Sequence, residues 1–273
     1  MQPTLQQPTA GSSLSTWFIN PLIGKLSKIN EVSQDSVTYG GIAAKCLGFM
    51  ASIFAGAVIA LLLQALDPMI LNADADITYM SPVAIVLGLL SLAFFLLMPF
   101  LAFLIKATIP VTGTLYCAST GYIFAFLSVV AQEYRGAILL AMILTTVIVA
   151  MMALIYAKGW IKVDQKFRSV MSILFWTTVA SSLLVGVCYF IPALKCVPEL
   201  IAQHPVVSLL GSLLYVVIAS LFLLVDFDTI KQAAERKLPR KYEWYAAFGL
   251  AFSVIWLFLK LFNLISKAKS SSK

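Results

Sequence analysis

Residues 46–66, CLGFMASIFAGAVIALLLQAL, form an apolar run that contains no charged side chain. A helix of about 20 such residues can cross the hydrocarbon core of a bilayer. Six more runs of this kind follow, at about 80–105, 109–131, 136–157, 169–191, 206–227 and 244–265. Because a helix satisfies its own backbone hydrogen bonds in lipid, the pattern predicts an all-α membrane protein, a bundle of seven transmembrane helices.

The composition points to the same class. Of the 273 residues, 61% are hydrophobic and only 11% are charged, whereas an average soluble domain is about one quarter charged. This excludes a soluble enzyme, a disordered protein and a disulfide-rich secreted module. A transmembrane β-barrel would show alternating segments of about ten residues, but these runs are continuous. We expect a polar N-terminal tail (1–41), a transmembrane domain (42–266) and a basic C-terminal tail (267–273).

The positive charges predict the orientation. With the N-terminus inside, 13 of the 19 Lys and Arg residues fall in inner segments, mainly 158–168 and 231–241. The first link, 67–79, contains three Asp residues and no cation. The positive-inside rule therefore favours a cytoplasmic N-terminus and an external C-terminus. Six crossings with a re-entrant last segment remain an alternative, since they would place the basic C-terminal tail inside.

The net charge of +7 is distributed between the apolar runs, so we expect the lipid bilayer as partner and no nucleic acid. The N-terminal tail lacks the basic, apolar and small-residue segments of a cleaved signal peptide. The motifs of soluble hydrolases and nucleotide-binding enzymes are missing, and only one histidine is present. The sequence therefore predicts no enzyme, no metal site and no cofactor.

One face of the sixth run carries small, hydroxylated and acidic residues, spaced alternately four and three apart: Ser208, Ser212, Tyr215, Ala219, Phe222, Asp226 and Thr229. We call this set the sixth-run stripe. Ionisable residues within membrane spans are candidates for function because their burial in lipid is costly. Asp228 points about 200° away from Asp226 on a helix, so the two carboxylates cannot share a proton or cation within this helix alone. The alternative for Asp226 is an ordinary acid at a helix end, solvated at the interface.

Two other polar features leave alternatives open. The third run contains Thr, Ser, Gly and Tyr residues between 112 and 122, which fit either the lining of a cavity or tight packing between helices. Lys260 lies in the last third of the final run, and we expect it to extend to the outer surface.

Two blocks carry a resemblance to a known family. VDFDTIKQ (225–232) and LPRKYEWYAAFGL (238–250) resemble the Bax-inhibitor-like/YccA family, and more narrowly its bacterial subgroup with an EWYAAFGL block. The resemblance implies seven helices, with a central last helix wrapped by the other six, in a bacterial plasma membrane. It also implies a pH-sensitive calcium leak in some members, and stress protection or modulation of membrane proteases in others.

The resemblance also implies site residues. The acid of the sixth helix corresponds to Asp226, and Asp228 is an additional acid. A partner acid is expected near residues 250–253, where Ser253 is the nearest polar side chain, and Glu243 lies about two and a half turns earlier. Lys106 is the nearest candidate for the basic latch. The sixth-run stripe, and not the resemblance, makes Ser212 and Tyr215 candidates for a latch or lining, because small and hydroxylated residues on one face suit helix contact or a wet cavity.

Two functional hypotheses follow. The first is a proton-gated cation leak centred on Asp226, whose protonation releases a contact to Lys106 or Ser253 and opens the helices. The second is a non-conducting regulatory protein that binds other membrane proteins, such as a quality-control protease. The missing second acid favours the second hypothesis, because a two-carboxylate sensor relies on repulsion between close like charges. A small-solute transporter is less well supported, because the chain shows no inverted repeat.

Overall fold

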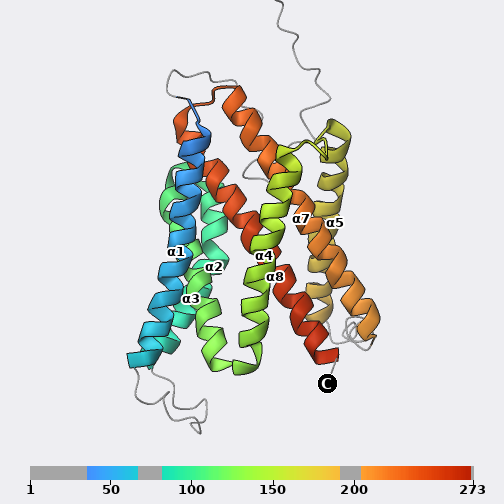
Figure 1. The fold of residues 1–273 in the computed structure, drawn as a ribbon. Helices are drawn as coiled ribbons and strands as arrows, with labels where there is room; N and C mark the ends of the chain where they lie inside the picture. Colours follow the sequence, from blue (N-terminus) through green and yellow to red (C-terminus); the bar gives the residue numbers. More distant parts are fainter. Residues whose placement is uncertain (1–35, 67–81, 191–203, 272–273) are drawn as a thin grey trace, which may run out of the picture.

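A computed structural model describes residues 36–66, 82–190 and 204–271 of the chain. In this part the chain forms α-helices that fall on the seven predicted runs, with two short 3-10 turns between them (Figure 1). The helices are α1 (Tyr39–Leu66), α2 (Pro82–Leu104), α3 (Ile109–Val130), α4 (Gln132–Ala157), α5 (Gln165–Phe190), α7 (Pro205–Glu235) and α8 (Glu243–Ser271), and the turns are η5 (Lys106–Thr108) and η7 (Arg240–Tyr242).

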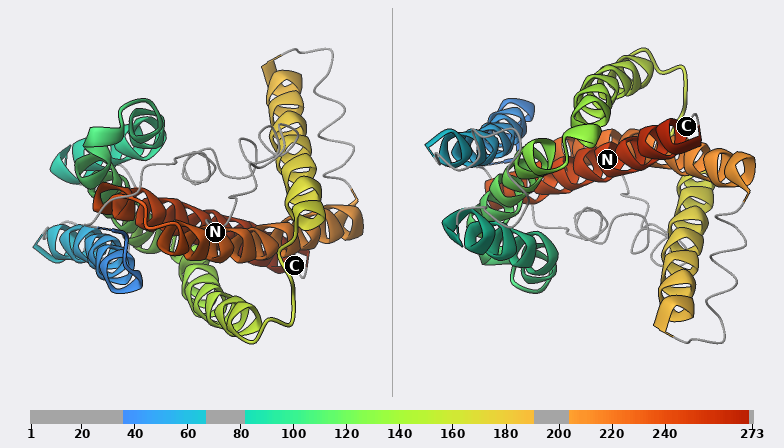
Figure 2. Two further views of the ribbon diagram at one scale, coloured as in Figure 1. Left: turned by 90° about the horizontal axis from the view of Figure 1, so that it is seen from above. Right: turned by 90° about the horizontal axis from the view of Figure 1, so that it is seen from below.

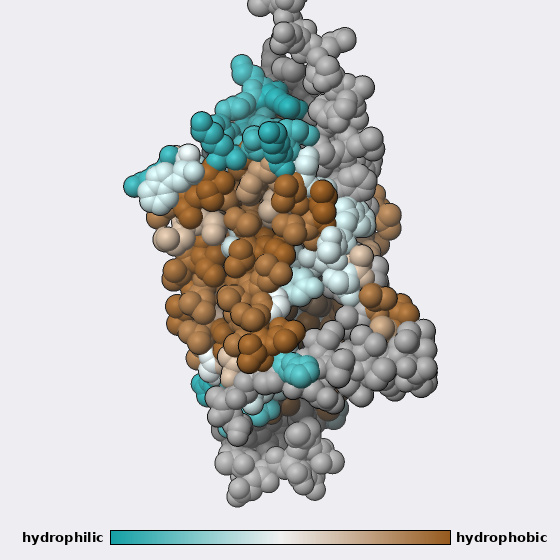
Figure 3. All heavy atoms as spheres, turned by 90° about the vertical axis from the view of Figure 1, so that its right-hand side faces the viewer, coloured by the Kyte–Doolittle hydropathy of each residue, from teal (hydrophilic) through white to brown (hydrophobic). Residues whose placement is uncertain are grey.

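Six of these helices, α1, α2, α3, α4, α7 and α8, are long and apolar enough to cross a membrane. The predicted all-helical, multi-pass membrane protein is therefore confirmed at this level, while a crossing by α5 stays a prediction. One side of the molecule shows a broad apolar surface with hydrophilic side chains gathered at its end, as expected for a lipid-facing belt (Figure 3). α8 is one uninterrupted helix and not a re-entrant pair of segments.

The last helix, α8, packs against α1, α3, α4 and α7 (Figure 2). α2 packs on α3, and α5 packs on α7. The fuller expectation, a last helix wrapped by all six others, stays a prediction. Figure 1 places the link between α4 and α5 and the link between α7 and α8 at the same end of the molecule as the start of α1. The two most basic described links thus share one end.

α1 and α3 approach each other closely through glycine. A Cβ atom on Gly56 would overlap the backbone carbonyl of Ala118, and one on Gly121 would overlap that of Ile53. The Thr120 hydroxyl donates to the Tyr116 carbonyl of its own helix at 2.8 Å, and the Thr112 hydroxyl donates to the Thr108 carbonyl just before α3 at 3.0 Å. Of the two interpretations of the polar third run, these contacts favour tight helix packing.

Several helices extend beyond the predicted runs: α4 and α5 each begin four residues early and α8 ends six residues late, in addition to α1 and α7. α1 starts at Tyr39 because Thr38 caps it, its hydroxyl accepting the Gly41 N–H at 3.0 Å. α7 continues to Glu235, eight residues past the end of its apolar run, through a polar segment outside the hydrophobic pattern. Residues 39–41 of the predicted polar tail are therefore helical, as are residues 267–271 of the predicted basic tail. Residues 1–35 and 272–273 lie outside the described residues.

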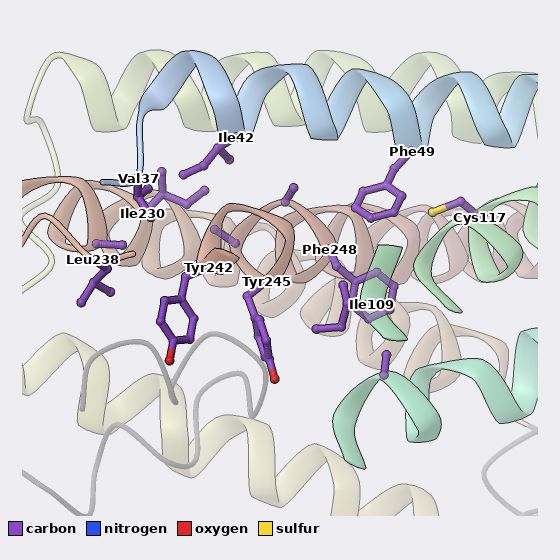
Figure 4. Close-up of a cluster of buried hydrophobic side chains, with 14 of the residues drawn as sticks. Val37, Ile42, Phe49, Ile109, Cys117, Ile230, Leu238, Tyr242, Tyr245 and Phe248 are labelled. Carbon is purple, nitrogen blue, oxygen red and sulfur yellow. The ribbon is translucent and has the colours of Figure 1, made fainter. Parts of the chain in front are cut away.

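A buried cluster joins the start of α1 to the start of α8 (Figure 4). The Val37 N–H donates to the Leu238 carbonyl at 2.7 Å, which fixes the chain before α1 to the link between α7 and α8. Phe49 and Phe248 continue the cluster along the two helices, with ring centroids 5.9 Å apart. This packing positions the first turn of α8, where Glu243 lies.

Candidate functional site

The sixth-run stripe lies on α7, and its described members face neighbouring helices. Ser212, Ala219, Phe222, Asp226 and Thr229 are all buried, and Asp226 is 0% exposed. Ser212 accepts a hydrogen bond from Lys267 of α8 at 2.9 Å. Phe222 contacts Trp256 of α8, with ring centroids 5.7 Å apart. The stripe therefore lies in the interior of the bundle, and Asp226 is not a carboxylate at the solvated end of a helix.

The contact between α7 and α8 places Asp226 level with Ser253. The helices are antiparallel (Figure 1), so a step toward the C-terminus of α7 corresponds to a step toward the N-terminus of α8. From the Phe222–Trp256 contact, four residues along α7 lead to Asp226, and three residues back along α8 lead to Ser253. Ser253 is also buried, at 5% exposed.

Asp228 occupies a different environment, where three helices meet. It forms an ion pair with Arg168 of α5 and accepts hydrogen bonds from the Tyr156 hydroxyl of α4 at 3.0 Å and from Gln232 at 2.9 Å. Arg168 is itself buried and also reaches the Thr229 hydroxyl at 3.4 Å. A buried ion pair is stable only when further hydrogen bonds satisfy its atoms, and Asp228 has these bonds. It acts as a structural connection between α4, α5 and α7.

Glu243 occupies a third environment, at the first turn of α8. Its side chain is 0% exposed and forms an ion pair with Lys45 of α1. The backbone N–H and the hydroxyl of Thr38 both donate to Glu243 Oε1 at 3.0 Å. A Cβ on Gly41 would overlap this carboxylate, so the backbone of α1 approaches it directly. Glu243 therefore fastens α1 to α8.

Ser212 and Tyr215, two other predicted residues with described side chains, do not join Asp226. Ser212 lies fourteen residues before Asp226 on α7, about 21 Å away along the helix. Tyr215 contacts Ser181 of α5, with the two hydroxyl oxygens 3.3 Å apart. Lys106 lies in η5, and its side chain lies outside the described residues. Of the predicted site residues on α7 and α8, the register brings Ser253 to the level of Asp226.

The sequence alone does not identify the partners of Asp228 and Glu243. In the sequence, Arg168 and Lys45 stand out only as cations that set the orientation, and Tyr156 is an ordinary residue of the fourth run. Their positions carry a signal, since each lies within about two turns of a helix end, where a buried acid of another helix can reach it. The sequence alone does not say which helix ends meet.

Lys260 differs from its predicted orientation. Its ammonium group lies over the ring of Tyr215, 5.0 Å from the centroid, and near that of Trp256, at 5.6 Å. The side chain therefore runs against α7 instead of extending freely to the surface. Cation–π contacts of this kind stabilise an ammonium group outside bulk water.

Within residues 36–66, 82–190 and 204–271, no three His, Cys, Asp or Glu side chains lie close enough together to hold a metal ion.

Comparison with known families agrees with the resemblance. The family described as Bax inhibitor 1 like matches residues 10–270, which is almost the whole chain. The chain belongs to this family, which is generally one of non-enzymatic membrane proteins. No curated protein and no solved structure matches the chain.

Proposed function

We propose that this member of the family is a proton-gated cation leak, with calcium as a permeant ion, and that Asp226 is its proton-sensing group. The observation that carries the proposal is the burial of this carboxylate. Asp226 is 0% exposed on a helix face that packs against α8. Charging a buried carboxyl group is costly, so its protonation state is coupled to the packing around it.

The proposed gate is the contact between α7 and α8. In the charged state, a contact between the Asp226 carboxylate and the Ser253 hydroxyl of α8 holds the two helices together, and in this proposal the contact outweighs the cost of burying the charge. Protonation removes the charge, weakens this contact and lets the helices separate. A single carboxylate binds a cation weakly, and weak binding suits conduction because the ion must also leave.

The same geometry assigns other roles to Asp228 and Glu243. Each carboxylate forms an ion pair with a cation of another helix. We therefore place the sensing function on Asp226 and not on Asp228 or Glu243.

A regulatory, non-conducting protein is the second candidate. Two ion pairs connect α1 with α8 and α5 with α7, so they hold the bundle together near one end. A bundle held in this way could present a fixed surface to a membrane protease or another quality-control protein.

For either function we propose a bacterial plasma membrane, a cytoplasmic N-terminus and a role in stress response. The basic links at one end of the molecule support that orientation.

Calcium flux into proteoliposomes across a pH series tests the proposal. We expect flux of the wild type to rise as the pH falls. Asp226→Asn mimics the protonated side chain, so its flux should remain high and lose its pH dependence. Asp164→Asn is a matched control, because Asp164 is exposed and only caps the start of α5, accepting the Phe167 N–H at 2.8 Å.

Two results would contradict the proposal. If Asp226→Asn keeps the calcium flux and pH profile of the wild type, Asp226 is not the sensor. If the wild type passes no cation at any pH and binds a membrane protease in a pull-down, the regulatory function replaces the leak.

A further inference from the structure

Lys260 carries a positive charge that the proposed gate does not use. It lies one turn beyond Trp256 on α8, and Trp256 contacts Phe222 of α7 with ring centroids 5.7 Å apart. Because α7 and α8 are antiparallel (Figure 1), four residues forward along α8 lead back along α7 to about the level of Ala219. Lys260 therefore lies beside the middle of α7.

The side chain of Lys260 is directed at the same face of α7 that carries the proposed sensor. Its ammonium group lies over the ring of Tyr215, 5.0 Å from the centroid. Tyr215 and Phe222 both belong to the sixth-run stripe. On α8, steps of three and four residues lead from Ser253 to Trp256 and then to Lys260, which places these three on one face. The two faces meet along one α7–α8 boundary.

The depth of Lys260 in the membrane makes its charge costly. Tyr215, over which the ammonium group lies, is the tenth of the 22 residues in the apolar run 206–227, close to its middle. Trp256 holds the same ammonium group from α8, with its ring centroid 5.6 Å away. Ionisable side chains at this depth are rare, and they mark ion pathways. Lys260 is therefore a candidate for a role in ion passage.

Carboxylates are missing from the helix segments around Lys260. The sequence contains no Asp or Glu in 165–190, in 205–225 or in 244–271. Asp226, the first acid along α7, lies eleven residues beyond Tyr215, or about 16 Å along the helix. A cation that passes Lys260 is much closer to the ammonium group than to this carboxylate, and Coulomb energy falls with distance. Repulsion by Lys260 therefore dominates at this level.

A fixed positive charge beside an ion path discriminates between ions by their charge. Coulomb energy is proportional to the product of the two charges, so Ca²⁺ is repelled twice as strongly as K⁺ at the same distance. The rate of passage depends exponentially on this energy. The factor by which the ammonium group slows a divalent ion is therefore the square of the factor for a monovalent ion.

We propose that Lys260 sets the valence selectivity of the leak, because its ammonium group slows divalent cations more than monovalent cations as they pass between α7 and α8. This inference rests on the proposed leak, in which these two helices separate. Asp226 then controls opening, and Lys260 controls which cations pass. Calcium remains permeant but passes more slowly than K⁺.

Ca²⁺ and K⁺ flux into proteoliposomes, measured at a pH at which the wild type is open, tests this role. Lys260→Met removes the charge and keeps a long side chain. We expect it to raise K⁺ flux about threefold and Ca²⁺ flux about tenfold, so that the Ca²⁺/K⁺ flux ratio rises about threefold. Lys260→Gln also removes the charge and should raise the ratio equally, and it replaces Lys260→Met if that variant does not fold.

Two control variants separate the effect of this charge from side-chain shape and from charge elsewhere. Lys260→Arg keeps the positive charge and should keep the wild-type ratio within about 1.5-fold. Lys162→Gln removes a positive charge from an exposed position in the α4–α5 link and should leave the ratio unchanged.

Two outcomes would overturn the inference and leave the leak in place. The neutral variants could pass both ions with the Ca²⁺/K⁺ ratio of the wild type, and the charge would then have no role in selectivity. Lys260→Arg could shift the ratio as much as Lys260→Met does, and side-chain shape would then replace charge as the cause. A wild type that passes neither ion at any pH would instead remove the leak itself, and this inference with it.

Discussion

Asp226 and Asp228 are separated by one residue on α7, yet their surroundings differ. Asp228 is held by Arg168, Tyr156 and Gln232. Asp226 is fully buried on the face that packs against α8. Because they are two positions apart on a helix, the two side chains point about 200° away from each other. Asp228 therefore reaches the ion pair with Arg168, whereas Asp226 faces α8 as the candidate sensor.

Asp228 should contribute strongly to stability. Asp228→Asn leaves Arg168 buried without its counter-charge, so we expect the free energy of unfolding to fall by about 3–5 kcal/mol. Tyr156→Phe removes one hydrogen bond and should cost about 1 kcal/mol. Glu235→Gln is the control, because Glu235 forms an exposed pair with Lys231 at 3.9 Å and such pairs contribute about 0–1 kcal/mol. Denaturant unfolding in detergent measures all three, and an equal effect of Asp228→Asn and Glu235→Gln would refute the structural role.

Position 41 of α1 requires glycine because a neighbouring side chain fills the space of a Cβ atom. A methyl group there overlaps the Glu243 carboxylate, so Gly41→Ala should destabilise the protein by about 1–3 kcal/mol. Gly48, also in α1, has open space around its Cβ position. Gly48→Ala should therefore stabilise α1 by up to about 1 kcal/mol. Thermal unfolding distinguishes the two, and a stabilising Gly41→Ala would mean that α1 lies farther from Glu243.

At the scale of the elements, Lys45 and Glu243 connect the first helix with the last. Glu243→Gln should cost about 3–5 kcal/mol of unfolding free energy because it leaves Lys45 without its partner. When Lys45→Met is combined with Glu243→Gln, the loss should be smaller than the sum of the two single losses by about 1–3 kcal/mol. A double-mutant cycle measures this coupling, and strictly additive losses would show that the pair does not stabilise the α1–α8 contact.

The close contact between α1 and α3 depends on glycine at position 121, which has no side chain. Gly121→Ala should destabilise the protein by about 1–3 kcal/mol, since its Cβ overlaps the backbone of α1. Gly211→Ala on α7 is the matched control, because its Cβ position is open. Thermal unfolding in the same detergent compares them. Equal midpoints for the two variants would contradict the close approach.

The elements themselves could largely be predicted from the sequence. Apolar length locates a membrane helix, and each predicted run coincides with a helix. The ends were less predictable, because Thr38 caps α1 through a hydroxyl and α7 continues through polar residues to Glu235. Hydropathy detects the part of a helix that lies in lipid and not the turns beyond it.

At the scale of the whole molecule, the site was only partly predictable. The spacing of the stripe selected Asp226, and the structure buries it. The spacing could not show that Glu243 meets Lys45 or that Asp228 meets Arg168, since each pair joins helices far apart in the sequence. Such pairs depend on which helices are neighbours, and no local pattern records that.

The most direct test of the central claim is infrared difference spectroscopy of the protein in the liposomes used for flux, over the same pH series. The difference between the wild type and Asp226→Asn isolates the carboxyl band of Asp226. We predict that the band of the protonated acid grows over the pH interval in which calcium flux rises. A band that stays unchanged across that interval, while the flux changes, would show that Asp226 is not the proton-sensing group.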